Sequence, residues 1–374
     1  MKKQAQDNPF VVYGYDSPEY FCDREGETAE LIDAIENGRN VTLLSPRRMG
    51  KTGLIHNVFH RLRKEGVWTP VYVDVFAAQN LAEFVQRFGA AVIGAMDTNV
   101  EKALSTATRF FRSFRPVVSV DPVTGAHSYS FTLDPANVES TLKECFDYLG
   151  KGGRRCVVAV DEFQQVADFP EKGTEALLRS YVQFLPHTRF IFAGSKRHLM
   201  AEMFSAPKRP FYNSTQTFPL GVIPKDAYFA FAERHMRAGG VKLSREVFDG
   251  VYGLFDGVTW YVQTVLNRLY GFRSAQPSDV ARAIDRVMAE NAYNYGNLLA
   301  TLPDGSIRLL RALAAEGRVR AVTAGAFMSR HGLHANSSVK ISLVKLLDSG
   351  LVSRDDDLSY RVDDRFFSMW LARL

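Results

Sequence analysis

Cysteine is scarce in this sequence, whose 374 residues include only Cys22, Cys145 and Cys156. The three are unevenly spaced and form no Cys-x-x-Cys pair, so we expect reduced, mostly buried thiols rather than a disulfide framework. No apolar run reaches the roughly 18–20 residues of a transmembrane helix, and the first residues lack the apolar stretch of a signal peptide. These absences predict a cytoplasmic protein with no membrane partner.

The excess of basic over acidic residues is also small, because the formal net charge is +5 over the whole chain. A surplus of this size is weak evidence for a nucleic-acid partner. Hydrophobic residues make up 46% and charged residues 23%, as in an ordinary globular protein. The length suffices for two or three domains, each with its own core.

Residues 41–52 read Val-Thr-Leu-Leu-Ser-Pro-Arg-Arg-Met-Gly-Lys-Thr, an apolar stretch that runs into a phosphate-binding loop. The Walker A pattern G-x-x-x-x-G-K-[ST] is met at Gly50, Lys51 and Thr52, with Ser45 in place of the first glycine. Such a loop surrounds a polyphosphate with backbone N–H groups at a helix N-terminus. Lys51 is expected to reach the β- and γ-phosphates, and the Thr52 hydroxyl to ligate Mg²⁺. The predicted nucleotide-binding residues of the loop are Ser45, Pro46, Arg47, Arg48, Met49, Gly50, Lys51, Thr52 and Gly53.

A second apolar stretch, at 156–160, ends in Asp161 and Glu162. A carboxylate at the carboxyl edge of a parallel sheet can hold the water shell of Mg²⁺, so Asp161 joins Thr52 as a candidate metal residue. Glu162 is the candidate general base that polarises an attacking water. The next strand pattern ends in Gly194-Ser195, and Ser195 is suited to bond the γ-phosphate or the water. The alternative for Ser195 is a Gly-Ser turn with no such role.

Arginine side chains can neutralise the charge that develops in phosphoryl transfer. Arg209 follows the fourth strand pattern, within the proline-stiffened run Lys-Arg-Pro-Phe-Tyr. It is a candidate catalytic arginine that acts on a neighbouring subunit of a homo-oligomer, and the alternative is a solvated surface arginine. Arg47 and Arg48 either contact phosphate or pair with neighbouring carboxylates.

Strand and helix patterns alternate up to Pro224, which predicts an α/β fold with a parallel sheet and helices on both faces. A turn signal within 101–135 also predicts a hairpin insertion there. The expected strands of the sheet are 41–44, 71–76, 156–160, 189–193 and 217–222.

Strand signals stop after Pro224, and the apolar spacing becomes helical. Three further helices and a short hairpin around 355–357 are typical of a winged helix-turn-helix. The predicted domains are a P-loop domain at 1–223, a helical lid at 224–300 and a winged helix at 301–374.

Several of these segments together resemble the archaeal-type ATPase family, whose P-loop ATPases are close to the AAA+ and STAND groups. The segments are Phe21-Cys22-Asp23-Arg24-Glu25, the loop at 45–52, Asp161-Glu162 and Gly194-Ser195. The family typically shows Phe-x-Gly-Arg-Glu and then Gly-Pro-Arg-Arg-x-Gly-Lys-Thr. The resemblance covers most of the chain, and its most specific part is Pro-Arg-Arg-x-Gly-Lys-Thr at 46–52. It implies an ATPase domain followed by a helical lid and a C-terminal winged helix.

The sequence departs from the family at three positions. Asp23 replaces a glycine, Ser45 replaces the first P-loop glycine, and Thr259 stands where a Gly-x-Pro signature has proline. In such ATPases the residues before the first helix lie near the adenine, so the resemblance makes Phe21 a candidate stacking residue. The alternative is a plain helix start, with acidic residues at the positive end of the helix dipole.

The winged helix leaves two kinds of partner open. Residues 301–374 carry eleven Lys or Arg and eight Asp or Glu, and the third helix offers polar side chains that are suited to reading bases. The wing, however, carries Asp355, Asp356 and Asp357 in succession, which disfavours contact with phosphates. Protein docking or interdomain packing is therefore preferred, and DNA remains a candidate partner.

The resulting hypothesis is Mg²⁺-dependent binding and hydrolysis of ATP, which drives a conformational switch of the helical and winged-helix domains. ATP is the expected nucleotide because no guanine-specific Asn-Lys-x-Asp element appears in the right place. One alternative is a slowly hydrolysing, nucleotide-gated scaffold that binds an unidentified protein. Another is a DNA-binding regulator that acts through the winged helix.

Overall fold

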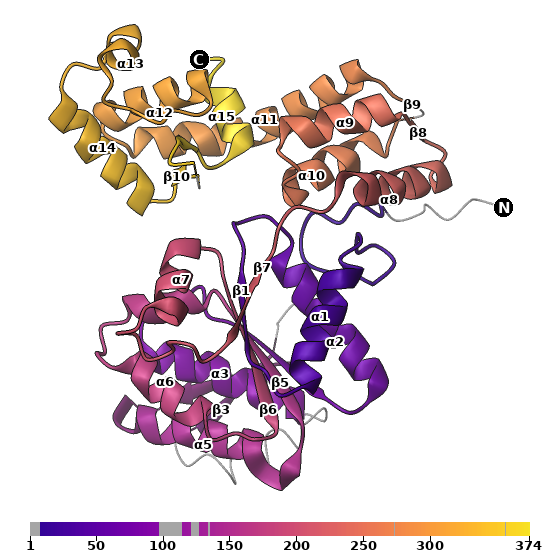
Figure 1. Cartoon of the computed structure of the whole chain (residues 1–374), viewed down its shortest axis with the longest axis vertical. Helices are drawn as coiled ribbons and strands as arrows, with labels where there is room; N and C mark the ends of the chain where they lie inside the picture. The colour runs from indigo at the N-terminus through magenta and orange to yellow at the C-terminus, as the bar shows by residue number, and fades with distance from the viewer. Residues whose placement is uncertain (1–7, 97–113, 121–126, 134, 273, 356) are drawn as a thin grey trace. The chain divides into compact units, whose positions relative to one another are not determined.

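The computed structural model describes residues 8–96, 114–120, 127–133, 135–272, 274–355 and 357–374 (Figure 1). This part of the chain divides into two compact units. The α/β unit contains the described part of Val11–Tyr228 together with Val258–Trp260. The helical unit contains residues 8–10, Phe229–Gly257 and Tyr261–Leu374. The predicted boundaries at 223 and 300 stay predictions.

A five-stranded sheet forms the centre of the α/β unit, in the order β2-β5-β6-β1-β7. Every neighbouring pair in it is parallel. The predicted parallel α/β fold is therefore confirmed, and the segments that follow β1, β5 and β6 meet at one edge of the sheet. The strands are β1 (Val41–Leu44), β2 (Thr69–Asp74), β5 (Cys156–Asp161), β6 (Thr188–Gly194) and β7 (Gln216–Pro219).

Alternating side chains of the strands build two apolar cores, one on each face of the sheet. Val157 and Ala159 pack into the core under α1 (Glu25–Glu36) and α2 (Lys51–Glu65). Val158 and Val160, which point to the opposite face, pack into the second core. In the described part of this unit four helices cover that face of the sheet (Figure 1). Those helices are α3 (Leu81–Met96), α5 (Val138–Gly150), α6 (Thr174–Val182) and α7 (Arg197–Ser205).

A separate hairpin lies within the predicted insertion. Its strands β3 (Phe114–Val120) and β4 (His127–Leu133) pair antiparallel, with Phe114 opposite Leu133. The rest of the predicted insertion, at 101–113, 121–126 and 134, lies outside the described residues.

The helical unit begins with four helices and a short parallel strand pair. The turn before α10 has positive φ at both Asp256 and Gly257, and a Cβ on Gly257 would lie 2.6 Å from the Tyr252 ring. Only glycine fits this second position, so the start of α10 is tightly defined. The elements are α8 (Lys225–Ala238), β8 (Lys242–Leu243), α9 (Arg245–Leu254), α10 (Thr259–Leu269), β9 (Ser274–Ala275) and α11 (Pro277–Ala300).

The predicted winged helix-turn-helix is confirmed. Three helices and a two-stranded antiparallel wing enclose a core that includes Leu309, Phe327, Leu343 and Leu346. A terminal helix, which the sequence patterns did not indicate, closes this core with Phe367 and Leu371. The elements are α12 (Asp304–Glu316), α13 (Gly325–Arg330), α14 (Asn336–Asp348), β10 (Val352–Arg354), β11 (Tyr360–Val362) and α15 (Arg365–Leu371).

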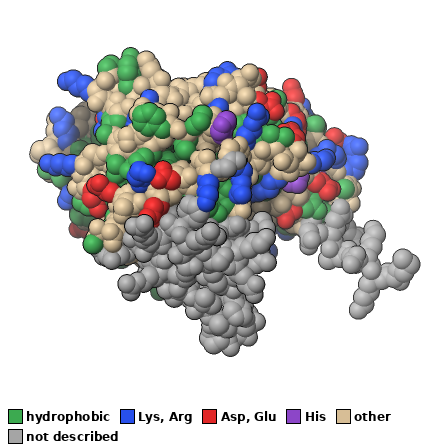
Figure 2. Space-filling view, turned by 90° about the horizontal axis from the view of Figure 1, so that it is seen from below, with side chains coloured by type: hydrophobic (Ala, Val, Ile, Leu, Met, Phe, Trp, Pro, Cys, Tyr) green, Lys and Arg blue, Asp and Glu red, His purple; other side chains and the backbone are tan. Residues whose placement is uncertain are grey.

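The burial of the cysteine thiols and the mixture of charges on the surface agree with the expectations from composition. All three cysteines are buried and free, and burial raises the pKa of the Cys156 thiol to about 11. No helix in the described part of the chain is both long and apolar enough to cross a membrane. Figure 2 shows one face of the molecule, where basic and acidic side chains are interspersed over the described surface.

Candidate functional site

The phosphate-binding loop lies between β1 and α2, at the carboxyl edge of the sheet. Gly50 has a φ of 86°, in the left-handed region that favours glycine, and α2 begins at the next residue. Ser45, which replaces the first glycine of the pattern, is fully buried, and its hydroxyl donates to the carbonyl of Pro46 at 3.0 Å. The loop therefore leads directly into a helix N-terminus, and the Ser45 side chain is buried within the loop.

The upstream segment packs against this loop. Arg24 is 2% exposed, and its guanidinium donates to the carbonyl oxygens of Met49 at 3.1 Å and Gly221 at 2.8 Å. A buried arginine that bonds two backbone carbonyls stabilises the loop, although the arginine itself lies upstream of it in the sequence. The Phe21 ring lies against the first turn of α2, so close that a Cβ on Gly53 would be 3.2 Å from the edge of the ring. Stacking of Phe21 on an adenine stays a prediction.

The start of α10 also contacts the loop, within the α/β unit. The Thr259 hydroxyl donates to the Met49 carbonyl at 3.2 Å, and the Trp260 N–H donates to the Arg48 carbonyl at 3.0 Å. The Arg48 guanidinium lies 4.3 Å from the centroid of the Trp260 ring, a cation–π distance. Thr259, which departs from the family proline, thus supplies a hydroxyl that proline lacks.

Asp161 ends β5 and is the centre of the polar cluster. Its Oδ1 accepts hydrogen bonds from Lys51 Nζ and, at 3.0 Å, from the Glu162 N–H. Its Oδ2 accepts from Thr52 Oγ1 at 2.7 Å and from the Tyr72 hydroxyl at 2.9 Å. Lys51 Nζ also lies 3.3 Å from Glu162 Oε1. The tertiary structure therefore brings together Lys51, Thr52, Asp161 and Glu162, as the motifs predicted.

Lys51 and Asp161 stabilise each other's charged form although both are buried. Burial alone would lower the pKa of Lys51, but the carboxylates of Asp161 and Glu162 outweigh it and raise that pKa. Burial alone would raise the pKa of Asp161, but the Lys51 charge and the hydrogen bonds lower it overall. Both groups are therefore ionised at neutral pH.

Glu162 has a φ of 57°, an uncommon backbone conformation for a residue other than glycine. Its Oε2 accepts hydrogen bonds from Ser195 Oγ at 2.8 Å and Gln164 Nε2 at 2.5 Å. Gly194, at the end of β6, allows this arrangement: a Cβ there would lie 2.2 Å from Gln164 Oε1 and 2.6 Å from Met200. Ser195 thus lies beside Glu162, which makes it part of the cluster.

Arg209 is paired with two carboxylates of its own chain. Its guanidinium lies 2.8 Å from Glu175 Oε1 and 3.7 Å from Glu202 Oε1. Pro46 and Arg47 are exposed on the loop. The role of Arg209 toward a neighbouring subunit stays a prediction.

Two residues of the cluster, Tyr72 and Gln164, were missed by sequence reasoning. Tyr72 occupies an ordinary alternating position of β2, and no local pattern indicates that β2 pairs with β5. Gln164 follows two residues after Glu162, so a polar residue close behind the acidic pair was the available signal.

The oxygen donors of the cluster fit Mg²⁺. No group of three or more His, Cys, Asp or Glu that could cage a metal occurs among the described residues. Mg²⁺ usually takes one or two protein oxygens and completes its shell with phosphates and water. The Thr52 hydroxyl and the Asp161 carboxylate are such a donor pair.

The sequence and the structure were compared with known proteins. Residues 21–265, more than half of the chain, match the family described as an ATPase domain predominantly from Archaea. The chain belongs to this family. Residues 293–373 match a probable winged helix domain, and no curated protein matches the sequence. The resemblance seen in the motifs is therefore confirmed.

Solved structures share the fold of this ATPase-family chain at low sequence identity. The Walker-type ATPase PABY2304 of Pyrococcus abyssi is 17% identical, with 98% of this chain and 100% of that chain covered and a TM-score of 0.67. The ORC2 protein of Aeropyrum pernix, solved in ADPNP–ADP complexes, is 17% identical, with coverages of 98% and 97% and a TM-score of 0.57. The ORC1 protein of Aeropyrum pernix, solved with DNA, is 16% identical, with coverages of 98% and 96% and a TM-score of 0.56.

Proposed function

We propose that the protein binds ATP with Mg²⁺ and hydrolyses it at the cluster around Asp161. The observation that carries this proposal is the convergence of Lys51, Thr52, Asp161 and Glu162 in one hydrogen-bonded group behind a P-loop. Lys51 bonds to two carboxylates, and the phosphate oxygens of ATP are competing anionic partners for its ammonium. The family membership supports an ATPase.

Each side chain has a chemical task in this proposal. Lys51 binds the β- and γ-phosphates, and Thr52 and Asp161 would hold Mg²⁺, which neutralises phosphate charge when bound. Glu162 accepts a proton from the attacking water as general base. Ser195 and Gln164 orient Glu162 through its Oε2.

The test is phosphate release by wild type, Glu162→Gln and Lys51→Ala. We expect Glu162→Gln to bind ATP but to hydrolyse it at least about 100-fold more slowly than wild type, because general-base catalysis contributes roughly 10²–10⁴-fold. Lys51→Ala should lose both binding and turnover. Glu36→Gln, at an exposed position of α1, and Lys143→Ala, in an exposed ion pair, are the matched controls. Equal turnover in all five proteins would remove the proposal.

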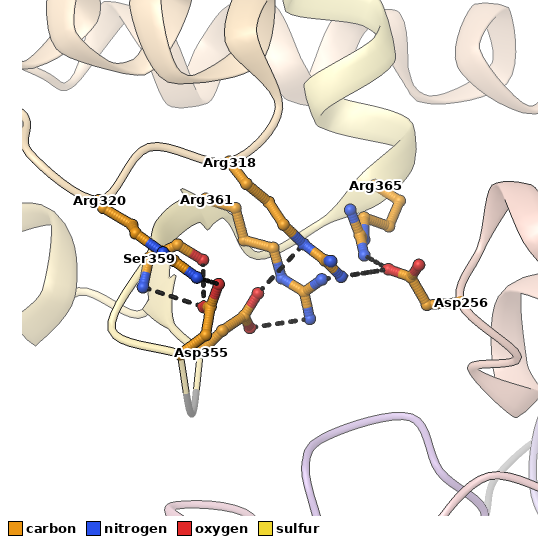
Figure 3. A network of polar contacts seen from close by, with 8 residues as sticks. Asp256, Arg318, Arg320, Asp355, Ser359, Arg361 and Arg365 are labelled. Carbon is orange, nitrogen blue, oxygen red and sulfur yellow. Dashed lines mark hydrogen bonds and ion pairs between the residues drawn. The ribbon is translucent and has the colours of Figure 1, made fainter.

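We further infer that nucleotide binding at the loop is coupled to the helical unit. A set of ion pairs, here the Asp256 cluster, supports this inference (Figure 3). Asp256 Oδ2 accepts from Arg318 at 2.7 Å, from Arg365, and lies 3.3 Å from Arg361. Asp355 of the wing pairs with Arg318 at 3.3 Å and Arg361 at 3.1 Å. The turn before α10 is thereby bonded to the winged helix.

Residues 256–260 carry two kinds of contact within a few residues of chain. Asp256 is bonded inside the helical unit, and Thr259 and Trp260 are bonded to the P-loop backbone inside the α/β unit. A displacement of the loop carbonyls of Arg48 and Met49 on nucleotide binding would act on this segment directly. A ligand shifts a conformational equilibrium only through such differential contacts.

Hydrogen exchange with and without a slowly hydrolysed ATP analogue tests the coupling. We expect the analogue to change amide protection at 256–260 and also at 359–366. In Asp256→Asn the first change should persist and the second should shrink, because the carboxylate is lost. Unchanged protection at 359–366 in wild type, with nucleotide bound, would contradict the coupling.

DNA binding is the second candidate function. The acidic wing disfavours it in the sequence, and the ion pairs of the wing weaken that objection. Asp355 pairs with Arg318 and Arg361, and Asp357 lies 3.1 Å from Arg320, so these two carboxylates are internally neutralised. Duplex retardation at 50 and 200 mM salt tests this function, since phosphate contacts make binding fall steeply with salt. Failure to retard any duplex at low salt would leave α14 as a protein-docking helix.

A further inference from the structure

Among the described residues, four donors bond to the Asp161 carboxylate, and the proposed ATPase mechanism removes one of them and shares another. Lys51 bonds to Oδ1 and would move to the phosphates. Thr52 bonds to Oδ2, and its oxygen would also ligate Mg²⁺. The Glu162 N–H bonds to Oδ1 from the backbone. The Tyr72 hydroxyl, 2.9 Å from Oδ2, is the fourth donor, and no motif assigns it a role.

Tyr72 reaches Asp161 because β2 is the neighbour of β5. In their parallel register Tyr72 lies opposite Ala159 and Asp74 opposite Asp161. Its side chain points to the sheet face that α1 and α2 cover, where it packs against that core. The hydroxyl therefore approaches Asp161 from the α2 side, next to Thr52.

The Tyr72 ring is held in place from α2 itself. Its centroid lies 4.6 Å from that of His56, which follows Thr52 by one helical turn. His56 also stacks on Tyr15, with ring centroids 5.9 Å apart. The phenol that bonds Asp161 and the helix that carries Thr52 are thus packed together, so the two Oδ2 donors have fixed relative positions.

These donors have different fates in the proposed mechanism. When Lys51 turns to phosphate, Oδ1 loses its charged partner and becomes available toward the nucleotide. The Glu162 N–H still bonds Oδ1 at 3.0 Å. A carboxylate rotates easily about its terminal torsion, so a second hydrogen bond, at Oδ2, is needed to fix its orientation. Tyr72 is the side-chain donor to Asp161 for which neither phosphate nor metal competes.

We propose that Tyr72 is a positioning residue for the magnesium site, which holds Asp161 Oδ2 so that Oδ1 is presented to the metal's water shell. The proposal rests on the proposed ATPase function. Tyr72 touches neither nucleotide nor metal in this role, and acts through Asp161. Its loss should weaken the response to Mg²⁺ and leave metal-independent nucleotide binding unchanged.

Tyr72→Phe tests the proposal, because it removes the hydroxyl and keeps the ring on His56. Binding of a fluorescent ATP analogue is measured in EDTA and over a Mg²⁺ titration, followed by phosphate release over the same titration. We expect unchanged affinity in EDTA, a Mg²⁺ half-saturation raised about tenfold, and turnover that recovers at saturating Mg²⁺. Tyr15→Phe is the matched control, because the Tyr15 ring also contacts His56 but its hydroxyl bonds Asn57 Oδ1, at 3.3 Å. The Mg²⁺ response of Tyr15→Phe should equal that of wild type.

The outcomes separate this role from a merely structural one. An unchanged Mg²⁺ half-saturation in Tyr72→Phe overturns the proposal. Equal loss of affinity in EDTA and in Mg²⁺ also overturns it, because a packing defect would weaken both. A wild-type protein that binds the analogue in neither condition refutes the proposed ATPase function itself, and the role of Tyr72 with it.

Discussion

The Asp256 cluster makes a quantitative prediction about the stability of the helical unit. Asp256→Asn removes the negative charge that three guanidinium groups share, while asparagine tolerates the positive φ of 51° at this position. Asp355 still pairs with Arg318 and Arg361 after the change. Arg365, whose pKa is lowered by burial and by the nearby Arg361 charge, should carry much of the loss.

The magnitude follows from the exposure of the partners. The Asp256 side chain is 43% exposed, so solvent screens each pair, and exposed pairs contribute about 0.2–1 kcal/mol each. Three such pairs around one carboxylate oxygen amount to about 2 kcal/mol. A loss of this size lowers the unfolding midpoint of a domain by roughly 4–8 °C.

Thermal unfolding at low and high salt is the assay. At about 1 M salt the Debye length falls to roughly 3 Å, so the difference between wild type and Asp256→Asn should shrink markedly. Asp285→Asn is the control, because it breaks one exposed pair with Arg373 at 2.7 Å and should shift the midpoint far less. Equal midpoints for Asp256→Asn and wild type at low salt would refute the reasoning, and a salt-independent difference would show that packing, not charge, is responsible.

Three further predictions concern the α/β unit. The pKa of Asp161 is lowered from 3.8, so the stability gained from its pair with Lys51 is complete above that pH and is lost as pH falls through the lowered pKa. Urea unfolding of wild type and Asp161→Asn should therefore differ by a constant amount from about pH 5 to 9 and converge in stronger acid; a difference that grows on acidification would contradict this. Gly194→Ala should destabilise the unit by about 1–3 kcal/mol in the same assay, because its methyl would lie within 2.2 Å of a neighbouring side chain. Arg209→Ala should abolish any rise of ATPase rate with protein concentration; a rise that persists would limit Arg209 to its pairing with Glu175.

Much of the candidate site was predictable because its parts are local patterns. Gly50, Lys51 and Thr52 lie in one loop, and Asp161 and Glu162 are adjacent at the end of an apolar strand. Parallel strands bring such strand ends to one edge, so the motifs could be joined before the sheet order was known. The family resemblance covers the same residues, and the match of residues 21–265 agrees with it.

Several contacts that the sequence did not predict join residues far apart in the chain. Tyr72 bonds Asp161 only because β2 lies beside β5, and Arg24 bonds Gly221 across nearly two hundred residues. The run of three aspartates in the wing disfavoured phosphate contact in the sequence, yet Asp355 and Asp357 are ion-paired with Arg318 and Arg320, which precede α13. Asp355 also pairs with Arg361, six residues further along the chain. Pairings of this kind leave no periodic signal in the sequence.

The proposed chemistry of this protein was predictable from short runs of sequence, since a P-loop and a strand ending in two acids need only local backbone geometry to present the candidate phosphate-binding and metal-binding groups. Only the tertiary structure decided which groups share those carboxylates and what holds the loop. Strand order placed Tyr72 on Asp161, and the turn at Asp256 and Gly257 placed Thr259 and Trp260 on the loop carbonyls. The physical reason is that a hydrogen bond depends on distance in space, which the chain sets through sheet pairing and packing rather than through neighbouring residues.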